Sequence, residues 1–426
     1  MKRTIFIITA ALSVAFGLHA AYAQTSAPAD SGYVAPTDRA LTDSIATSAA
    51  PPDTVAQRAI FEVLGHYVLH KPYKTEPSKP RTGLHWSILP TLSYNTVYGV
   101  AVGAMVAIAG QRGGKDSHYS SLKLGGNYAS SGQLQAYVRG NLWSKGEKFL
   151  FAPDMRWLDT DRKTWGLGPF DSTDQKYPMS FVLSRAFLTA YVHTVGPVYL
   201  GVGYHYDQFK KITDERANKG EDTPFTTYSG GALEQTVASG ISGNLLIDRR
   251  DNEVTPSRGY YLSTSYREYL TGLGSDSDWN ELWGEFRAYS RLSRTDRNVI
   301  GVWLYGWGTT DKPPYLNLPS SGWDEPHGRA SRGYVHGRIR GQDQLYGEIE
   351  YRRVLTANGL LGAVAFVNGL STRETASSKF ESPDPAAGLG LRIRLNKHSR
   401  ANLCIDYGSN FDGSSHSWQL AMNETF

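Results

Sequence analysis

An arginine and two carboxylates near the end of the chain are the residues best suited to a specific chemistry. Arg332 stands in the triplet Arg332-Gly333-Tyr334, and Glu348 and Glu350 follow in an alternating stretch. A guanidinium is planar and carries five donors, and a carboxylate offsets the cost of removing it from water. Because residues two apart in a strand share a face, Glu348 and Glu350 are both candidate partners. The pattern predicts an ion pair that ties a loop to a strand.

The neighbours of Arg332 suit a backbone that must turn and then pack. Gly333 permits a tight turn, and Tyr334 can bury its ring while its hydroxyl stays hydrogen-bonded. The triplet lies near the end of a turn-rich interval, residues 309–341, that contains four prolines and several glycines. Since loops longer than about 12 to 15 residues in a compact fold are usually functional or disordered, we expect this loop to have a role.

Catalytic and metal-binding constellations are weak in this sequence. Asp324, Glu325 and His327 have the residue types for acid–base work, but they lie in no recognisable motif, and a solvated surface turn accounts for them. His193 and His205 fall on separate predicted strands and lack zinc spacing. No glycine-rich phosphate loop is present. We therefore expect no enzymatic activity, no cofactor and no metal.

The elements that position the arginine and the carboxylates read as β-strands. From His85 onward, aromatic and β-branched runs are separated by turn residues about every 20 residues, and runs such as 198–206 and 281–292 alternate in polarity. Dividing residues 85–426 by a repeat of roughly 20 to 22 residues gives about 16 strands, an even number as bacterial barrels require. The predicted fold is all-β: a 16-stranded antiparallel transmembrane β-barrel.

An exported soluble β-sandwich is the alternative to a membrane barrel. The charged face of the run at 281–292 carries both signs together with large aromatic side chains, as in Glu281, Trp283, Glu285 and Arg287. A crowded, wet lumen accommodates such a mixture. The composition, with 26 Tyr and 10 Trp, also suits membrane–water interfaces. These features favour the barrel.

The last residues of the sequence form an amphipathic strand. In "SWQLAMNETF", Trp418, Leu420, Met422 and Phe426 are expected to share one face. A final Phe after such a strand resembles the sorting signal of bacterial outer-membrane barrels. The predicted location is therefore the bacterial outer membrane.

The first residues indicate export. Lys2 and Arg3 precede an apolar run, and Ala21-Tyr22-Ala23 is a small-x-small cleavage site, so residues 1–23 read as a signal peptide. Residues 24–84 are predicted to be a flexible periplasmic segment with a short helix or plug near 60–69, and residues 85–426 form the barrel. The formal net charge of +4 falls to +2 without Lys2 and Arg3, which gives no case for nucleic-acid binding.

Three stretches carry a family resemblance, and they occur in the family's order. The Arg-Gly-Tyr triplet ahead of residues 346–352, the hairpin "DRRDNEVTPSRGYYL" at 248–262, and a closing hairpin at 386–407 are similar to the superfamily of barrel-assembly and two-partner-secretion translocases, whose barrel is the bacterial surface antigen domain. The resemblance implies that the arginine belongs to an extracellular loop that folds back into the lumen. The hairpin residues that match the family are Asp251, Asn252, Pro256, Arg258 and Gly259.

Two departures from the family shape the functional expectations. Where the family has an Asp on the strand after the carboxylates, this chain has Asn368, so we expect Arg332 to rest on Glu350 alone or to use Asn368 as a neutral acceptor. The family's folded periplasmic modules have no counterpart in residues 24–84. We therefore expect a separate periplasmic or lipoprotein partner, in addition to outer-membrane lipid.

Three functions remain open at this point. The first is assistance to the insertion or export of proteins, or of lipids, through a weak seam between the first and last strands. The second is a pore whose arginine-rich lumen favours anions, and the third is a lipid-modifying enzyme that would use His327. A purely structural brace remains the alternative role for Arg332. The matched stretches favour the first function.

Overall fold

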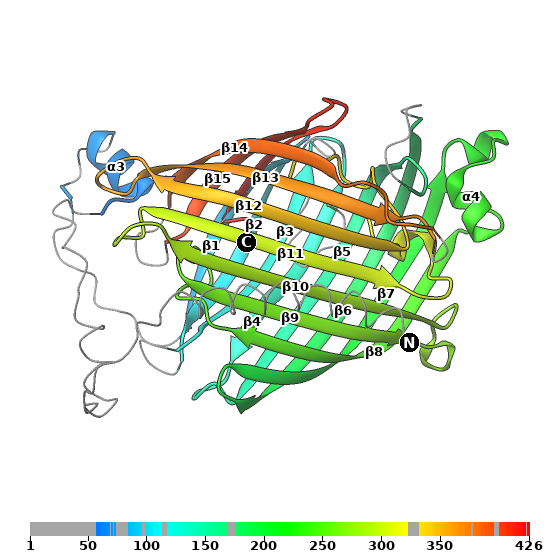
Figure 1. Cartoon of the computed structure of the whole chain (residues 1–426), viewed down its shortest axis with the longest axis horizontal. Coiled ribbons are helices and arrows are strands. Elements are labelled where there is room, and N and C mark those ends of the chain that lie inside the picture. The colour runs from blue at the N-terminus through cyan, green and yellow to red at the C-terminus, as the bar shows by residue number, and fades with distance from the viewer. Residues whose placement is uncertain are drawn as a thin grey trace, which may run out of the picture.

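The structure, a computed structural model (Figure 1), describes most of the chain after residue 56. The described residues are 57–68, 70, 72–73, 84–95, 99–112, 117–168, 175–322, 332–375, 378–395, 400–422 and 424–426. The predicted signal peptide and the candidates Asp324, Glu325 and His327 lie outside them.

Sixteen strands dominate the described chain. They are β1 (His85–Asn95), β2 (Gly99–Gln111), β3 (Tyr119–Ala129), β4 (Leu134–Trp143), β5 (Phe149–Thr164), β6 (Tyr177–Val195), β7 (Val198–Asp214), β8 (Gln235–Asp248), β9 (Gly259–Tyr269), β10 (Trp279–Arg291), β11 (Asn298–Thr309), β12 (Asp343–Val354), β13 (Leu361–Arg373), β14 (Asp384–Arg394), β15 (Asn402–Asn410) and β16 (His416–Met422). Each strand is antiparallel to its neighbours in the chain, and β1 also pairs with β16, so the sheet closes into a barrel. The predicted strand number is confirmed, and β1 begins at His85.

Helical structure is short and lies at the two ends of the barrel. Helix α3 (Ile60–Tyr67) lies at one end, and α4 (Pro224–Ser229) lies at the other, as Figure 1 shows. The described residues also contain three 3-10 turns: η1 (Ala217–Lys219), η2 (Thr271–Leu273) and η3 (Tyr315–Asn317). No helix in the described part of the chain is both long and apolar enough to cross a membrane. We refer below to the α3 end and the α4 end of the barrel.

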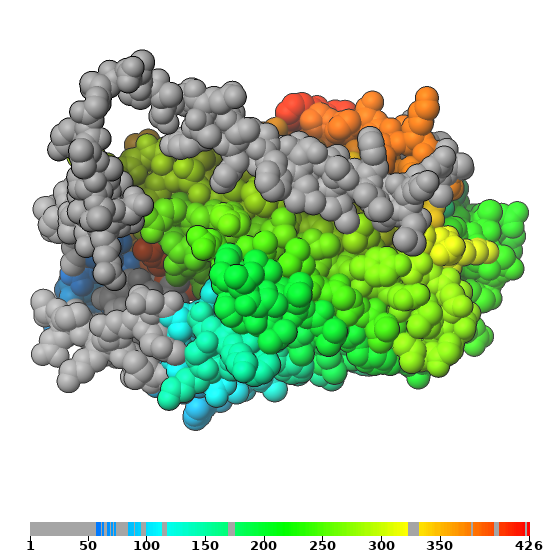
Figure 2. All heavy atoms as spheres, turned by 60° about the horizontal axis from the view of Figure 1, so that its bottom comes forward, coloured from blue at the N-terminus to red at the C-terminus, as the bar shows by residue number. Residues whose placement is uncertain are grey.

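Alternating side chains give the barrel wall an inner and an outer face. On β12, Glu348 and Glu350 are fully buried, whereas Ile349 between them is 49% exposed. Period-2 alternation of this kind places every second residue on the outside of the wall. The outer positions carry large apolar side chains such as Val202, Val367 and Leu389. Figure 2 shows the wall around β8 to β10, in green, as a continuous surface.

The inside of the barrel is packed on one side by aromatic rings. A cluster of buried residues joins β10 to β13 and includes Trp283, Trp303, Tyr305 and Tyr346. The Trp283 and Tyr305 rings stack with centroids 5.0 Å apart, and the Tyr305 and Tyr346 rings stack at 4.9 Å. Stacked rings contribute beyond the apolar area that they bury. This side of the lumen is therefore a rigid core against which a loop can pack.

Among the described residues, the pairing between β1 and β16 is much shorter than the other strand pairings. β1 pairs with β2 along its whole length, from His85 with Ala109 to Asn95 with Gly99. Against β16, within the described residues, it pairs at two positions, Tyr94 with Leu420 and Asn95 with Gln419. The part of β1 nearer the α3 end, residues 85–93, therefore has an edge that no described strand occupies. We call this contact the seam.

The expected shared face of the final residues is wrong for Phe426. Trp418 is an exposed residue of β16, but Phe426 follows the strand and is 3% exposed. Its ring packs inside the barrel, 5.3 Å from the ring of Trp303. Phe426 can leave the strand direction because the β16 strand ends at Met422, and Arg352 then donates a hydrogen bond to the Phe426 carbonyl at 2.6 Å.

A substitution on the outer face of the barrel tests whether this face contacts lipid. Val367 lies in the middle of β13 and is 46% exposed, so Val367→Arg would place a guanidinium in the hydrocarbon region. We expect the free energy of unfolding in lipid vesicles to fall by about 2 to 4 kcal/mol. Denaturant titration followed by Trp fluorescence measures the change, with Val367→Leu as the control. Equal stability of the two variants would contradict a lipid-facing Val367.

Candidate functional site

The guanidinium of Arg332 is the centre of a buried network of charges. Its Nη2 donates to Glu350 Oε2 at 2.5 Å and also to Glu348 Oε1, and its Nε donates to Glu348 Oε2 at 3.2 Å. Its Nη1 lies 3.4 Å from Asp406 Oδ2 on β15. Both expected carboxylates contact the arginine, and Asp406 is a third. One loop residue thus connects β12 with β15.

Burial makes these contacts strong and their loss costly. Arg332 is 1% exposed, and the Phe366 ring centroid lies 3.9 Å from its Cζ atom. Burial alone would lower the pKa of Arg332, but Glu348, Glu350 and Asp406 outweigh it and raise that pKa well above its ordinary value. The arginine is therefore permanently charged. Removing it would leave three buried carboxylates without their shared cation.

The network continues beyond Arg332 to the end of the chain. Arg352 bonds to Glu350 and to the Phe426 carbonyl. On the other side, Arg392 Nη1 donates to Asp406 at 2.5 Å, and its Nε donates to Glu424 at 2.7 Å. Arginines and carboxylates alternate along this path, so each charge lies against an opposite one. We give the name Arg332 network to the following residues: Arg332, Glu348, Glu350, Arg352, Arg392, Asp406, Glu424 and Phe426.

The two residues after Arg332 attach the loop to the last strands. Gly333 N donates to Ser417 Oγ on β16 at 2.9 Å, and the Tyr334 hydroxyl donates to the Asp384 carbonyl on β14. Gly333 has a φ of +95°, and an added Cβ would lie 2.9 Å from Ala386 Cβ. A left-handed conformation in such close quarters requires glycine. The triplet therefore fixes the loop to β14 and β16 as well as to β12 and β15.

Asn368 acts differently from the neutral acceptor that the sequence suggested. Its Nδ2 donates to the Arg332 carbonyl at 2.9 Å and to Glu348 Oε2 at 3.1 Å. The amide therefore supports the loop backbone and one carboxylate, and it does not accept from the guanidinium. The expectation that Arg332 rests on Glu350 alone is also wrong, because Glu348 and Asp406 share the guanidinium.

Sequence reasoning missed Asp406 because it lies on a different strand, 74 residues from Arg332. A usable signal existed in the alternation of β15, where the polar residues Asn402, Asp406 and Asn410 share one parity. That parity indicates an inward face. It does not identify the strand that closes beside the loop, which follows from the barrel register of β12 to β15.

The family-like hairpin residues form a self-supporting turn between β8 and β9. Asp251 Oδ1 accepts from the backbone N–H of Ser257 and Arg258, and Asn252 Oδ1 accepts from those of Val254 and Thr255. Gly259 has a φ of +101°, where an added Cβ would collide with the Arg249 carbonyl. These bonds satisfy a turn backbone locally. Pro256 connects the turn to the Arg332 network, since its carbonyl accepts from Arg352 Nη1 at 3.1 Å.

A cavity opens between this hairpin and the strands of the Arg332 network. It has a volume of about 330 Å³ and lies at the α3 end. Its lining is rich in arginine and includes two acids. The lining residues with charge are Asp296, Arg297, Arg352, Arg353, Arg392, Arg394, Arg400 and Glu424.

Helix α3 lies beside the cavity at the same end. Arg58 N donates to the Asn358 carbonyl in the β12–β13 turn at 2.9 Å, and Gln57 lines the cavity. The helix expected within residues 60–69 is present as α3. The contacts of Gln57 and Arg58, just before the helix, place its start next to the β12–β13 turn.

Comparison with known proteins places these features in a family. A family model described as the Omp85 superfamily domain matches residues 139–426, which is more than half of the chain. No curated protein matches by sequence.

Among solved structures, BamA from Haemophilus ducreyi lacking POTRA domains 1-3 is similar with a TM-score of 0.51 at 14% identity, over 79% of this chain and 70% of that one. CdiB from Escherichia coli has a TM-score of 0.52 at 11% identity, over 82% of this chain and 64% of that one. The chain therefore spans less than two thirds of CdiB. At such identities the likeness concerns the fold.

Removal of the central cation is the direct test of the Arg332 network. We expect Arg332→Ala to lower the free energy of unfolding by about 3 to 5 kcal/mol, because it leaves buried carboxylates uncompensated. The temperature at which the barrel loses its heat-modifiable migration on gels should fall with it. Arg216→Ala is the matched control, since Arg216 pairs with Glu221 at 2.8 Å on an exposed surface, where a pair contributes about 0 to 1 kcal/mol. Equal effects of the two substitutions would rule out a structural role for the network.

Asn368 offers a sharper test, because Asp, which the family has at this position, is expected to destabilise this barrel. Asn368→Asp would remove the donor to the Arg332 carbonyl and bring a carboxylate near Glu348. We expect a loss of roughly 1 to 3 kcal/mol at pH 8, because the donor to the Arg332 carbonyl is lost and a second carboxylate lies beside Glu348. Thermal melts at this pH measure it. Asn358→Asp, whose oxygen keeps its turn bond from Leu360 N, serves as the control. A stabilising Asn368→Asp would show that the donor role is wrong.

Proposed function

The chain belongs to the Omp85 superfamily, and from that premise we propose that its barrel assists the insertion or export of proteins, or of lipids, at the bacterial outer membrane. The role is not enzymatic. The observation that carries the proposal is the seam, where no described strand pairs with the outer edge of β1 along residues 85–93.

An open strand edge in a bilayer has a strong tendency to pair. Hydrocarbon offers no hydrogen bonds, so an unpaired backbone group there costs several kcal/mol. The outer side chains of this segment are apolar, with Trp86 72% and Ile88 65% exposed, which places the edge beside lipid. Pro90 in the same segment removes one donor, as is usual for edge strands. An incoming strand would satisfy the remaining groups.

The opposite side of the seam is held without help from β1. The Gly333 N–H bonds to Ser417 on β16, and the Val335 N–H bonds to Ser415 just before that strand. Because Arg332 fixes the same loop to β12 and β15, β16 keeps its place when β1 moves. We infer that this is the function of the loop, which reaches into the lumen at these residues.

The residues after β16 also keep the seam open. If the β1–β16 register continued, Glu424 would lie opposite Pro90 and Phe426 opposite Ile88. Both residues instead turn inward, where Arg392 and Asn402 bind Glu424 and Arg352 binds the Phe426 carbonyl. The network thus withdraws the polypeptide that could close the edge of β1. The charge pairs in the lumen therefore also keep the seam open.

A partner at the α3 end fits this role. One of the solved structures named above is a form of BamA that lacks POTRA domains 1-3. In this chain the described residues before the barrel form only α3 and short flanking pieces. We infer that a periplasmic or lipoprotein partner presents client chains at the α3 end, close to the open part of β1.

An anion-selective pore is the second candidate, and the arginine-lined cavity favours it. Six arginines and two acids surround about 330 Å³ at the α3 end. Two of these arginines, Arg352 and Arg392, are engaged by Glu350, Asp406 and Glu424, which lowers the net positive field. Planar-bilayer conductance with anion selectivity that survives closure of the seam would favour the pore.

Closing the seam covalently is the experiment that tests the main proposal. Tyr94→Cys with Leu420→Cys places two thiols at a directly paired position, where the distance suits a disulfide. We expect oxidation of this variant in vesicles to abolish the insertion of an unfolded barrel protein, because β1 can no longer accept a new strand. Reductant should restore the activity. Protection of the client from added protease reports insertion.

The matched control crosslinks two strands, β1 and β2, that stay paired in the proposed mechanism. Leu92→Cys with Val102→Cys crosslinks β1 to β2 at paired, exposed positions. It should keep full activity when oxidised. The native Cys404 is buried and can stay in place. Undiminished insertion by the oxidised seam variant would overturn the proposal.

A further inference from the structure

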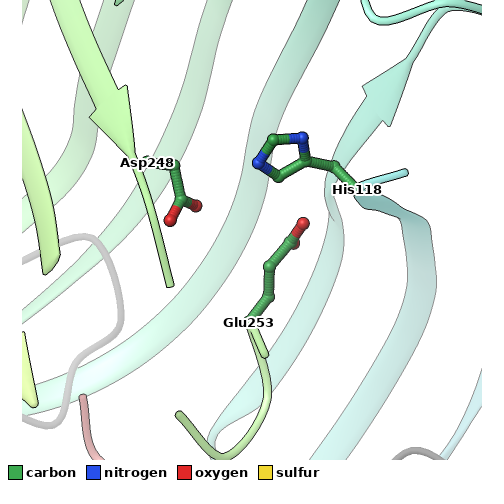
Figure 3. Close-up of side chains that lie close together, drawn as sticks. All are labelled: His118, Asp248 and Glu253. Atoms are coloured by element: carbon green, nitrogen blue, oxygen red, sulfur yellow. The ribbon is translucent and has the colours of Figure 1, made fainter. Parts of the chain in front are cut away.

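A cluster of metal-ligating side chains lies at the α3 end, away from the Arg332 network. His118 precedes β3, Asp248 is the last residue of β8, and Glu253 belongs to the β8–β9 hairpin. One ligand atom from each lies within 4.8 Å of the other two, and Figure 3 shows the three side chains converging. The cluster thus brings the start of β3 against a hairpin more than 120 residues away. Sequence spacing could not reveal it.

The His118 ring is oriented as a metal-binding imidazole would be. Its Nδ1 lies 3.0 Å from Glu147 Oε1, and its ring stacks on Trp143 with centroids 4.3 Å apart. The other ring nitrogen points toward Asp248 in Figure 3. Metal-binding histidines almost always give their second nitrogen to a carboxylate or carbonyl, which fixes the tautomer and the ring. Glu147 lies at ion-pair distance from Nδ1, and its Oε1 accepts a hydrogen bond from the His118 backbone N–H, so it can take this role once the side chain adjusts.

Three carboxyl groups and one arginine meet around His118. Glu147, Asp248 and Glu253 supply the carboxyl groups, and Arg250 bonds to both oxygens of Asp248. A metal ligand must be deprotonated, so a divalent cation bound between His118, Asp248 and Glu253 would displace any proton that these groups hold and would offset the carboxylate charge.

The available ligand atoms suit a transition metal. Each carboxylate oxygen offers more than one lone pair, so Asp248 can keep Arg250 and still coordinate. Glu253 uses one oxygen for the Tyr119 N–H at 3.1 Å and has a second. A nitrogen with two carboxylates suits Zn²⁺ better than Ca²⁺ or Mg²⁺, which prefer oxygen alone. Zinc ligands at about 2 Å are themselves roughly 3 to 4 Å apart, so the side chains need to move little.

We propose that His118, Asp248 and Glu253 form a binding site for a divalent transition-metal ion, with Zn²⁺ as the best fit. The bound ion would tie the β2–β3 connection to the β8–β9 hairpin across the α3 end of the barrel. The existing bond between Tyr119 N and Glu253 joins the same two segments, so the metal strengthens a contact that the fold already makes. The site is independent of the seam.

Zinc titration of the purified full-length barrel tests the site. The protein is treated with EDTA in detergent, dialysed, and titrated by calorimetry with ZnCl₂ and, separately, with MgCl₂. We expect one Zn²⁺ per barrel and no comparable Mg²⁺ binding. His118→Gln and Glu253→Gln should each weaken Zn²⁺ binding at least tenfold. Heat-modifiable migration on gels verifies that each variant is folded.

A nearby exposed histidine provides the matched control. His193 lies at the same end of the barrel, on β6 before the turn to β7, and is exposed. His193→Gln should leave the isotherm unchanged. Failure of the wild-type barrel to take up Zn²⁺ stoichiometrically would overturn the proposal without any variant. Equal affinity in wild type, His118→Gln and Glu253→Gln would show that the metal binds elsewhere and would overturn it too.

Discussion

Backbone hydrogen bonding in a medium without water is the constraint on which this structure depends. Inside a bilayer each N–H and C=O must find its partner in the protein, and a closed sheet provides those partners. Fifteen consecutive antiparallel pairings, from β1–β2 to β15–β16, meet the constraint here. The sixteenth, β1 with β16, meets it at two described positions. Among the described strands, the pairing of β1 with β16 is the one that is incomplete. The proposed activity follows from this incomplete pairing.

The Arg332 network explains why the incomplete closure does not unravel the barrel. A cation inside the lumen holds carboxylates from β12 and β15, while its neighbours Gly333 and Tyr334 hold β16 and β14. Buried pairs of this type resist loss of one partner more than they add net stability. These ion pairs therefore serve mainly to hold strands in position. They keep β16 and the residues after it in fixed places while the edge of β1 stays free to pair.

The sequence predicted local patterns well and spatial neighbours poorly. Period-2 alternation and the spacing of turns gave the barrel, its 16 strands and its first residue. The parity of Glu348 and Glu350 placed both carboxylates on the face that meets Arg332. Asp406, the donor role of Asn368 and the inward turn of Phe426 depend on which strands close beside the loop, and a single sequence does not encode that register in any local pattern. The family resemblance predicted that the Arg332 loop folds into the lumen. It did not predict how Glu348, Asp406 and Asn368 share the contacts of Arg332.

Hydrogen–deuterium exchange of β1 in lipid nanodiscs tests the central claim most directly. If residues 85–93 have an open edge, a peptide covering them should exchange more of its amides than a strand paired on both sides, because alternate N–H groups point toward the seam and lack a strand partner there. A peptide covering β12, paired on both sides by β11 and β13, should stay protected over hours. Equal protection of the two peptides would contradict an open seam and the function proposed from it.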